Sequence, residues 1–512
     1  MRPDPDRRWR DRGMLRRGTG HLARERSPRW PYLVGASLLC LVAASCGTRL
    51  SDGALASAKG ALSGGGAASG NGGGLTGSFT TSPGSAGAGS GGSTPASAGT
   101  GSSAGGGTAG SASVAASGGA SGSGSSGGAC GGGTGGSTDI GVTSSTITVA
   151  NIASISGVAP GLTQSAQQAT EAWADYVNSQ GGICGRNVKV IPMDDGNDSQ
   201  QNYADAAQAC NSAFAIVGSA SAFDDGTASA AAKCGIPVVA AENSTTAADN
   251  VPNIFAASPG NARYWPLGAA EYLKAKYPDA IGKAAMIYLN PPVTADQAKR
   301  EMRAYQSVGF NYVYTAAVSV TEPNYAPYVL QMQQKGVQYV TVYSDLSSAA
   351  RLDQAMAQQN FQPQVVDWMA EMYSPDFPNQ TQPASNGNLV LMATANYDEA
   401  SGNPGMQTFL SWMNRVAPGF KHDIFAEFAW SAGMAFLKAA EAVGPHLTRT
   451  ALLQQLAQIH NWDGGGVQPP MDFGNKVPSQ CFSYTQIEGT AFKRLYPSSA
   501  NQYDCSGGLY KF

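Results

Sequence analysis

Short β-rich runs alternate with helical stretches from residue 138 to residue 512, and this alternation restricts the possible folds more than any other feature. In the predicted helix 164–180, for example, apolar residues recur at Ala169, Ala172, Trp173 and Tyr176, and Gly181 follows its end. Strands separated by helices join in parallel, so the fold class is α/β with parallel sheets flanked by helices. Strands are predicted at 147–152, 188–191, 214–217, 236–240, 285–289, 312–316 and 339–343, and further helices at 203–213, 228–233, 297–307 and 325–335.

A glycine-rich stretch precedes the alternating region and limits the length of chain that can fold. Of the 65 glycines, 32 fall in the 87 residues 51–137, which contain only two charged residues, Asp52 and Lys59. Such a segment buries too little apolar surface to offset the entropy of ordering it. We therefore interpret 46–137 as a disordered Gly/Ser/Ala-rich tether, with a root-mean-square reach of roughly 50 Å.

The N-terminus has the pattern of an export signal. The first 30 residues contain ten Arg and four Asp or Glu, and an apolar run of 13 residues follows at 32–44. That run is too short to span a bilayer but suits the core of a signal peptide, predicted at 1–45. Small residues before Cys46 resemble the lipobox of bacterial lipoproteins, whereas Leu39 makes Cys40 a poor alternative. This resemblance implies lipidation at Cys46 and an anchor on the outer face of the cytoplasmic membrane.

Charge and cysteine content agree with export and argue against nucleic acid as a partner. After Trp30 the chain contains 22 basic and 31 acidic residues, a balance of −9, while phosphate binding requires clustered Lys and Arg. Apart from Cys40 and Cys46 in the predicted signal region, the chain has six cysteines. They allow up to three disulfides, and the alternative is that some remain free buried thiols. Proximity in the sequence favours Cys210–Cys234 and Cys481–Cys505, which leaves Cys130–Cys184 as the third pair.

Catalytic and metal patterns are weak, so the sequence predicts no enzyme, cofactor or metal site. None of His422, His446 and His460 lies four residues from another, and no CxxC pair is present. Ser219 and Ser221 have no evident His partner, and no Gly-x-Ser-x-Gly turn occurs. The acidic run 194–198 lacks the register and the closing Glu of a calcium loop.

The order of several short motifs is similar to the leucine/isoleucine/valine-binding proteins of ABC importers. These motifs are VNSQGGICGRNVKVIPMDD at 177–195, AIVG at 215–218 before a serine-bearing loop, CGIPVV at 234–239 and FAAS at 255–258. The resemblance implies a type I periplasmic-binding fold with two α/β lobes and a three-crossover hinge. It places one lobe at 138–257 and 394–470 and the other at 258–393 and 471–512, with crossovers near 256–258, 392–395 and 468–471.

The same resemblance implies a ligand site between the lobes. The loop that contains Ser219, Ser221 and Ala222 matches the segment that holds a ligand carboxylate, and hydroxyls with free N–H groups before a helix suit an anion. The turn with Glu242, Ser244 and Thr245 matches a second contact region, and Glu371 matches the strand-end carboxylate that meets a ligand ammonium. The alternative is that the serines only form turns and that Glu371 is solvated.

At some positions the residue differs from the one usual in the family, so the resemblance does not determine the identity of the ligand. Val293 and Ser344 stand where the family offers tyrosines, and Glu242 replaces a small residue. Phe223, Tyr343 or Tyr373 are candidates for apolar walls.

The function implied by the resemblance is capture of a small amino acid or related zwitterion for delivery to an ABC permease. A ligand sensor or surface-interaction protein with the same fold and no transport role is the alternative.

Overall fold

The computed structural model describes residues 130, 133 and 135–512. The chain divides into two compact units, 1–115 and 116–512, and the first lies wholly outside the described residues. The predicted signal peptide 1–45, the lipidation site Cys46 and almost all of the tether 46–137 also lie outside them.

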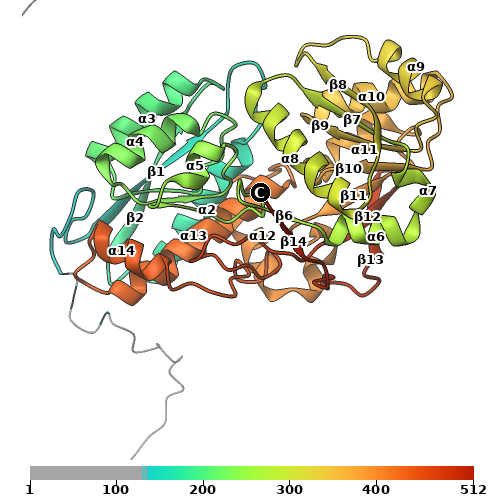
Figure 1. Cartoon of the computed structure of the whole chain (residues 1–512). Helices are drawn as coiled ribbons and strands as arrows, with labels where there is room; N and C mark the ends of the chain where they lie inside the picture. The colour runs from blue at the N-terminus through green and yellow to red at the C-terminus, as the bar shows by residue number, and fades with distance from the viewer. Residues whose placement is uncertain (1–129, 131–132, 134) are drawn as a thin grey trace, which may run out of the picture. The chain divides into compact units, whose positions relative to one another are not determined.

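A five-stranded parallel sheet forms the centre of the first lobe (Figure 1), with the strand order β2-β1-β3-β4-β5. Its strands are β1 (Thr146–Ala153), β2 (Asn187–Asp194), β3 (Ala215–Val217), β4 (Val238–Ala240) and β5 (Ile254–Ala256). Its helices are α2 (Gln164–Ser179), α3 (Ser199–Ser212), α4 (Asp225–Cys234), α5 (Thr246–Asn250), α12 (Pro404–Val416), α13 (Ile424–Val443) and α14 (Arg449–Leu456).

A seven-stranded sheet forms the second lobe, in the order β13-β12-β11-β10-β9-β7-β8. Five of its strands are parallel, namely β7 (Ala284–Leu289), β8 (Tyr312–Val318), β9 (Tyr339–Tyr343), β10 (Val365–Trp368) and β11 (Leu389–Met392). An antiparallel hairpin that the sequence did not predict, β12 (Ser483–Glu488) and β13 (Ala491–Tyr496), completes it. Gly489 adopts a φ of 61° in the hairpin turn, which suits a residue without Cβ.

Helices and a small sheet surround the second lobe. Two short strands, β6 (Tyr264–Pro266) and β14 (Leu509–Lys511), pair antiparallel. The helices are α6 (Gly268–Lys276), α7 (Pro278–Ile281), α8 (Pro292–Val308), α9 (Ala326–Gln334), α10 (Leu346–Gln358), α11 (Asp376–Thr381) and the 3₁₀ turn η1 (Ala370–Met372). A second 3₁₀ turn, η2 (Tyr397–Gly402), lies between β11 and α12 and packs against α12.

Local capping explains the main differences between predicted and observed helix ends. Helix α3 begins at Ser199 rather than near residue 203, because the Asp198 side chain accepts hydrogen bonds from the N–H groups of Gln200 and Gln201. Helix α8 begins at Pro292 rather than near 297, since proline suits the first turn, where an N–H has no helical partner.

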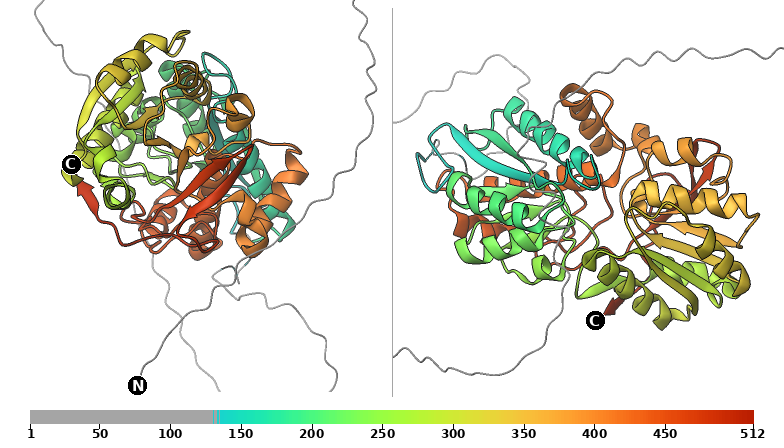
Figure 2. Two further views of the ribbon diagram at one scale, coloured as in Figure 1. Left: turned by 90° about the vertical axis from the view of Figure 1, so that its right-hand side faces the viewer. Right: turned by 90° about the horizontal axis from the view of Figure 1, so that it is seen from above.

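The chain passes between the two sheets three times, and hydrogen bonds join these passages. The passages lie between β5 and β7, between β11 and α12, and between α14 and β12. The N–H of Ala395 donates to the carbonyl of Val467 at 2.9 Å, and the side chain of Gln468 donates to the carbonyl of Ala257 at 3.1 Å. Figure 2 shows the two lobes on either side of these connections.

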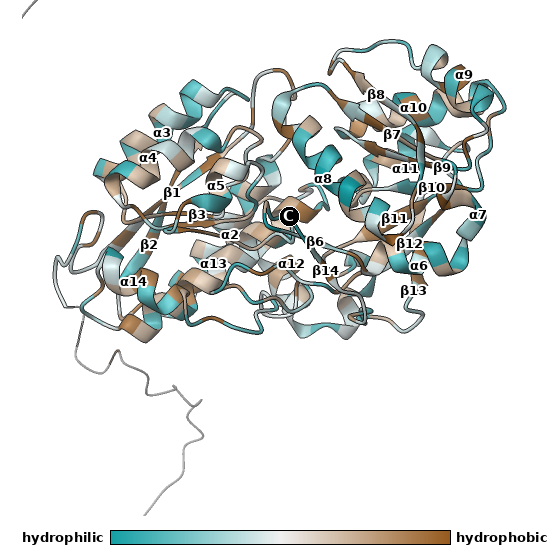
Figure 3. Ribbon diagram, viewed as in Figure 1, coloured by the Kyte–Doolittle hydropathy of each residue, from teal (hydrophilic) through white to brown (hydrophobic). Residues whose placement is uncertain are grey.

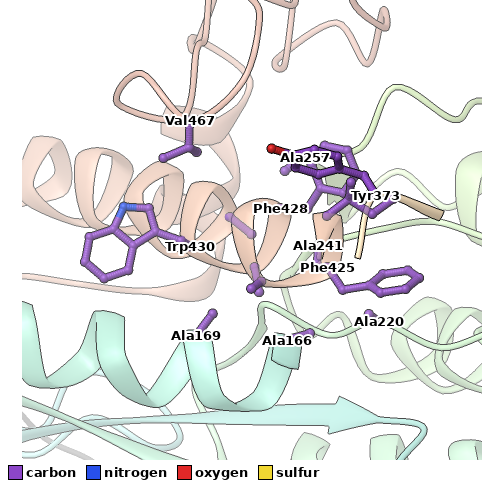
Figure 4. Packing of buried hydrophobic residues seen from close by; sticks show 14 of the residues in the cluster. Ala166, Ala169, Ala220, Ala241, Ala257, Tyr373, Phe425, Phe428, Trp430 and Val467 are labelled. Atoms are coloured by element: carbon purple, nitrogen blue, oxygen red, sulfur yellow. The ribbon is translucent and has the colours of Figure 1, made fainter. Parts of the chain in front are cut away.

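Alternate residues of each strand enter different cores, as expected of strands covered on both faces. In the first lobe, Val149 and Val217 pack toward α2 and α13, whereas Ala150 and Ile216 pack toward α3 and α4. Apolar colour accordingly concentrates in the interior of both lobes (Figure 3). Small residues of α2, such as Ala166, face α13 and permit close packing (Figure 4).

Six cysteines lie in three pairs at bonding distance, in the pairing that their spacing favoured. The S–S distances are 2.00 Å for Cys130–Cys184, 2.05 Å for Cys210–Cys234 and 2.11 Å for Cys481–Cys505. The second pair joins α3 to α4, and the first joins residue 130 to the loop before β2.

Candidate functional site

A cavity of about 440 Å³ lies where loops from both lobes meet. Its first-lobe wall comes from the segments that follow β1, β3 and β4, and its second-lobe wall from those that follow β7, β9 and β10. Ligands of α/β proteins bind beyond the carboxyl ends of parallel strands for this topological reason. The volume lies within the range of small-molecule sites, about 300–1,000 Å³.

Five of the seven predicted ligand residues line this cavity and two do not. The five are Ser221, Ala222, Glu242, Ser244 and Glu371. Ser219 instead lies behind the loop, where its hydroxyl accepts a hydrogen bond from the N–H of Ile152 at 2.9 Å. The hydroxyl of Thr245 accepts from the N–H of Ala248 at 3.2 Å and caps α5.

The hydroxyl of Ser221 is already engaged inside the first lobe. It donates to the carboxylate of Asp195 and accepts from the N–H of Phe223 at 2.9 Å. The N–H groups of Ser221 and Ala222 have no acceptor within the described part of the chain. The backbone N–H groups, rather than the hydroxyl, are therefore what this loop could offer to an anion.

Asp224 already accepts hydrogen bonds from backbone N–H groups of the second predicted contact region, the turn after β4. Its carboxylate accepts from the N–H groups of Ser244 at 2.7 Å and Thr245 at 3.1 Å. Burial raises the pKa of Asp224 to about 7 although these hydrogen bonds oppose the shift. Ser244 thus offers the cavity its hydroxyl alone, and this side chain is only 7% exposed.

Five carboxylates line the cavity; Asp345 and Asp423 cap helices, Asp376 lies near Lys421, and the remaining two, Glu371 and Glu242, come one from each lobe. Glu371 lies in η1 after β10, and its Oε2 is buried with no hydrogen-bond partner among the described residues. Burial raises the pKa of Glu371 to about 7. Burial, together with the charges of Glu371, Asp224 and Asp249, raises the pKa of Glu242 to about 8. Glu371 is therefore not a solvated surface carboxylate.

Several lining residues had no signal in the sequence strong enough to place them here. Arg351 of α10 donates to the carbonyl of Val320 at 3.3 Å and to the hydroxyl of Ser348 at 2.8 Å, while its Nε is buried and unpartnered among the described residues. Lys421 lines the opposite side and lies 3.9 Å from Asp376. Isolated cations in unremarkable helices and loops carry no motif, so only the packing reveals them.

The expected wall residues are partly present. Phe223 and Tyr343 line the cavity, as do Val293 and Ser344, the two residues at positions where tyrosines were expected. Tyr373 does not line it, because its ring packs in the core against Tyr397 at 6.0 Å and Phe492 at 4.7 Å.

Within residues 135–512 the structure contains no cluster of three or more His, Cys, Asp or Glu side chains arranged to hold a metal ion. In the same range, no helix combines the length and apolarity that crossing a membrane requires.

Solved structures share this fold at low sequence identity. A fatty acid ABC transporter substrate-binding protein from Thermomonospora curvata is 17% identical, with a TM-score of 0.60 over 73% of this chain and 95% of that one. A leucine-binding protein from Thermotoga maritima is 13% identical, with a TM-score of 0.57 over 68% and 97%. An ABC transporter solute-binding protein from R. palustris in complex with benzoate is 15% identical, with a TM-score of 0.56 over 68% and 95%.

The sequence comparison gives the family directly. No match to the chain was found among curated proteins. A family model for periplasmic binding proteins matches residues 146–491, which include both sheets apart from the final residues of β13. With its two parallel-sheet lobes and three connections, the chain belongs to the periplasmic binding protein family.

Proposed function

We propose that this protein is an extracytoplasmic solute receptor that captures a small amino acid or related zwitterion and delivers it to an ABC permease. The observation that carries the proposal is the carboxylate of Glu371, which lines the interlobe cavity with a buried, unpartnered oxygen. An uncompensated buried carboxylate is costly, and an ammonium group supplies the missing partner.

The other end of a zwitterion finds donors on both walls of the cavity. The N–H groups of Ser221 and Ala222 precede α4 and are free to meet a carboxylate. The hydroxyl of Ser244 lies on the same wall, and Arg351 adds a guanidinium on the second lobe. Apolar surface from Leu289 and Phe425 lines the space between the polar groups.

Capture would couple binding to closure. Ser221, Ala222 and Ser244 belong to the first lobe, whereas Glu371 and Arg351 belong to the second. A solute that contacts both walls binds the closed state better than the open state, and it shifts the hinge equilibrium by that difference in affinity.

Calorimetry on Glu371 variants tests the proposal. A thermal-shift screen of amino acids and related zwitterions first identifies a ligand. We expect Glu371→Ala to weaken binding of that ligand by about 2–4 kcal/mol, the scale for truncating one member of a buried charged pair. Ser244→Ala should cost about 1 kcal/mol, since it removes one neutral hydrogen bond. Unchanged affinity of the Glu371 variant, or a screen in which only solutes without an amine bind, would contradict amine recognition.

A further inference from the structure

The interlobe cavity has two acidic side chains that the protein itself does not neutralise. Glu242 follows β4 in the first lobe, Glu371 follows β10 in the second, and both line the cavity. Among the described residues neither carboxylate takes part in an ion pair. The two groups are close enough for the charge of Glu371 to raise the pKa of Glu242.

Two neighbouring acids, Asp224 and Asp249, differ from this pair because they have partners. Asp224 accepts two backbone N–H groups. Asp249 accepts from Asn243 at 3.1 Å and from the N–H of Ala262, and the charges of Arg300 and Arg263 face it. A third acid, Glu301 of α8, has no such partner among the described residues; it is buried in the second lobe and does not line the cavity, and burial with the charges of Asp367 and Glu371 raises its pKa to about 8.

The cations at the cavity do not compensate the pair either. Arg351 makes its hydrogen bonds to Val320 and Ser348, and Lys421 lies near Asp376. Neither forms an ion pair with Glu242 or Glu371. Ser244, a residue only 7% exposed whose hydroxyl makes no hydrogen bond in the described part of the chain, lines the same cavity.

Contacts between the lobes hold this side of the cavity together. The side-chain amide of Gln297 on α8 donates to the carbonyl of Ser244 at 3.1 Å. Nearby, the hydroxyl of Thr246 lies 3.4 Å from the carboxylate of Asp296. The loop that contains Glu242 is therefore tied to helix α8 of the second lobe.

We propose that Glu242 and Glu371 form one cation site shared by the two lobes, in which Glu242 is a specificity-determining residue. The inference rests on the proposed function and extends it: the solute's positively charged nitrogen binds between both carboxylates, not at Glu371 alone. Amines, diamines and guanidinium compounds are the matching chemical class. A neutral or purely anionic solute leaves the pair uncompensated.

This arrangement also explains how a cation would favour closure. Two carboxylates that approach one another repel, so an empty site closes only when at least one of them holds a proton. The raised pKa values of both groups, about 8 for Glu242 and about 7 for Glu371, agree with a proton held near neutral pH. A bound cation takes the place of that proton and contacts both lobes at once.

The experiment compares Glu242→Gln, Glu371→Gln and the double variant with a charge-matched control. The control is Glu271→Gln, which removes an exposed carboxylate on α6 outside the cavity. Thermal shift and calorimetry use L-leucine, L-lysine, L-arginine, 1,4-diaminobutane and benzoate as probes. We expect at least one cationic probe to bind the parent protein and each single cavity variant to lose at least tenfold in affinity. The control should bind as the parent does.

Proton release provides a second readout. Calorimetry at pH 7 in two buffers with different ionisation enthalpies should show protons released on binding by the parent and fewer by Glu242→Gln. The comparison uses heats of ligand binding measured on folded protein. A melting curve for each variant establishes that the variant folds. Should Glu242→Gln not fold, the conservative Glu242→Asp takes its place and is expected to weaken binding by less than tenfold.

The outcomes separate this inference from the proposed function. If Glu371→Gln weakens binding and the Glu242 variant binds as tightly as the parent, the shared site is wrong and capture by Glu371 stands. If neither variant changes the affinity for a cationic probe, or if only benzoate binds, both proposals are overturned.

Discussion

At the scale of single residues, some buried carboxylates receive hydrogen bonds from the protein and others do not. Asp195 is fully buried, and its oxygens accept hydrogen bonds from Ser154, Asn197, Asn202 and Ser221. It therefore holds the loops after β1, β2 and β3 together, and the acidic run 194–198 has a structural role. Glu427 is the opposite case, because both of its buried oxygens lack partners among the described residues.

Glu427 should make the stability of the protein depend on pH. Burial raises its pKa well above the ordinary value of a glutamate, so the folded protein retains a proton that the unfolded chain releases. Its stabilising contribution is present in acid and is lost as the pH rises toward the folded-state pKa. We expect Glu427→Gln to be nearly neutral at pH 5 and to stabilise the protein by about 1–3 kcal/mol at pH 8.

Thermal melts of the parent and of Glu427→Gln between pH 5 and pH 9 test this prediction. The exposed Glu488→Gln is the control, and its melting curve should follow that of the parent. Parallel pH profiles of the parent and Glu427→Gln would show that the carboxyl group does not titrate with folding.

At the scale of elements, the packing of α13 on α2 sets the distance between two long helices of the first lobe. Trp173 of α2 is fully buried, and its ring lies 5.7 Å from that of Phe436 in an edge-to-face arrangement. Gly433 of α13 lies beside this ring, and a Cβ added there would be 2.5 Å from Trp173 Cγ. The absence of a side chain at Gly433 is what allows the two helices to approach.

Gly433→Ala should therefore destabilise the protein although alanine is the better helix former. The expected cost of overpacking is about 1–3 kcal/mol, partly offset by a gain of about 1 kcal/mol in helix propensity. Gly282→Ala is the matched control, since the nearest atom to its added Cβ is 3.6 Å away and its φ is −69°. Denaturant unfolding measures both variants, and a Gly433→Ala protein more stable than the parent would contradict the packing argument.

At the scale of the whole molecule, three connections let two separately packed lobes share one cavity. Each lobe has its own parallel sheet, and the connections meet through the hydrogen bonds from Ala395 to Val467 and from Gln468 to Ala257. Closure about these connections, as proposed above, would require little rearrangement within either lobe.

The proposed location of the protein is also a property of the whole chain. We propose export and attachment to the outer face of the cytoplasmic membrane through Cys46, which lies outside the described residues. Cys46→Ser should release the protein from the membrane fraction, because it removes the residue that receives the lipid. Fractionation followed by immunoblotting tests this, with Cys40→Ser as the control that stays membrane-bound; retention of the Cys46 variant would rule out the anchor.

The sequence by itself was sufficient to predict the α/β class, seven of the fourteen strands of the described residues and the two-lobed family. Hydrophobic periodicity and glycine positions are local properties, as in the helix that begins at Gln164 and ends before Gly181. It also placed Glu371 and the loop of Ser221 and Ala222 at strand ends. The order and spacing of short motifs carried this information, because the lengths of successive strands and helices determine which loops reach the same edge.

Only the tertiary structure decided which of those groups remain free to bind. Asp195 takes the hydroxyl of Ser221, and Asp224 takes the N–H groups of Ser244 and Thr245, across distances in sequence of 20 residues or more. The antiparallel hairpin β12–β13 and the presence of Glu242 and Glu371 in one cavity likewise depend on contacts between distant segments. No local pattern encodes them, because burial and partner choice arise only when both lobes have packed.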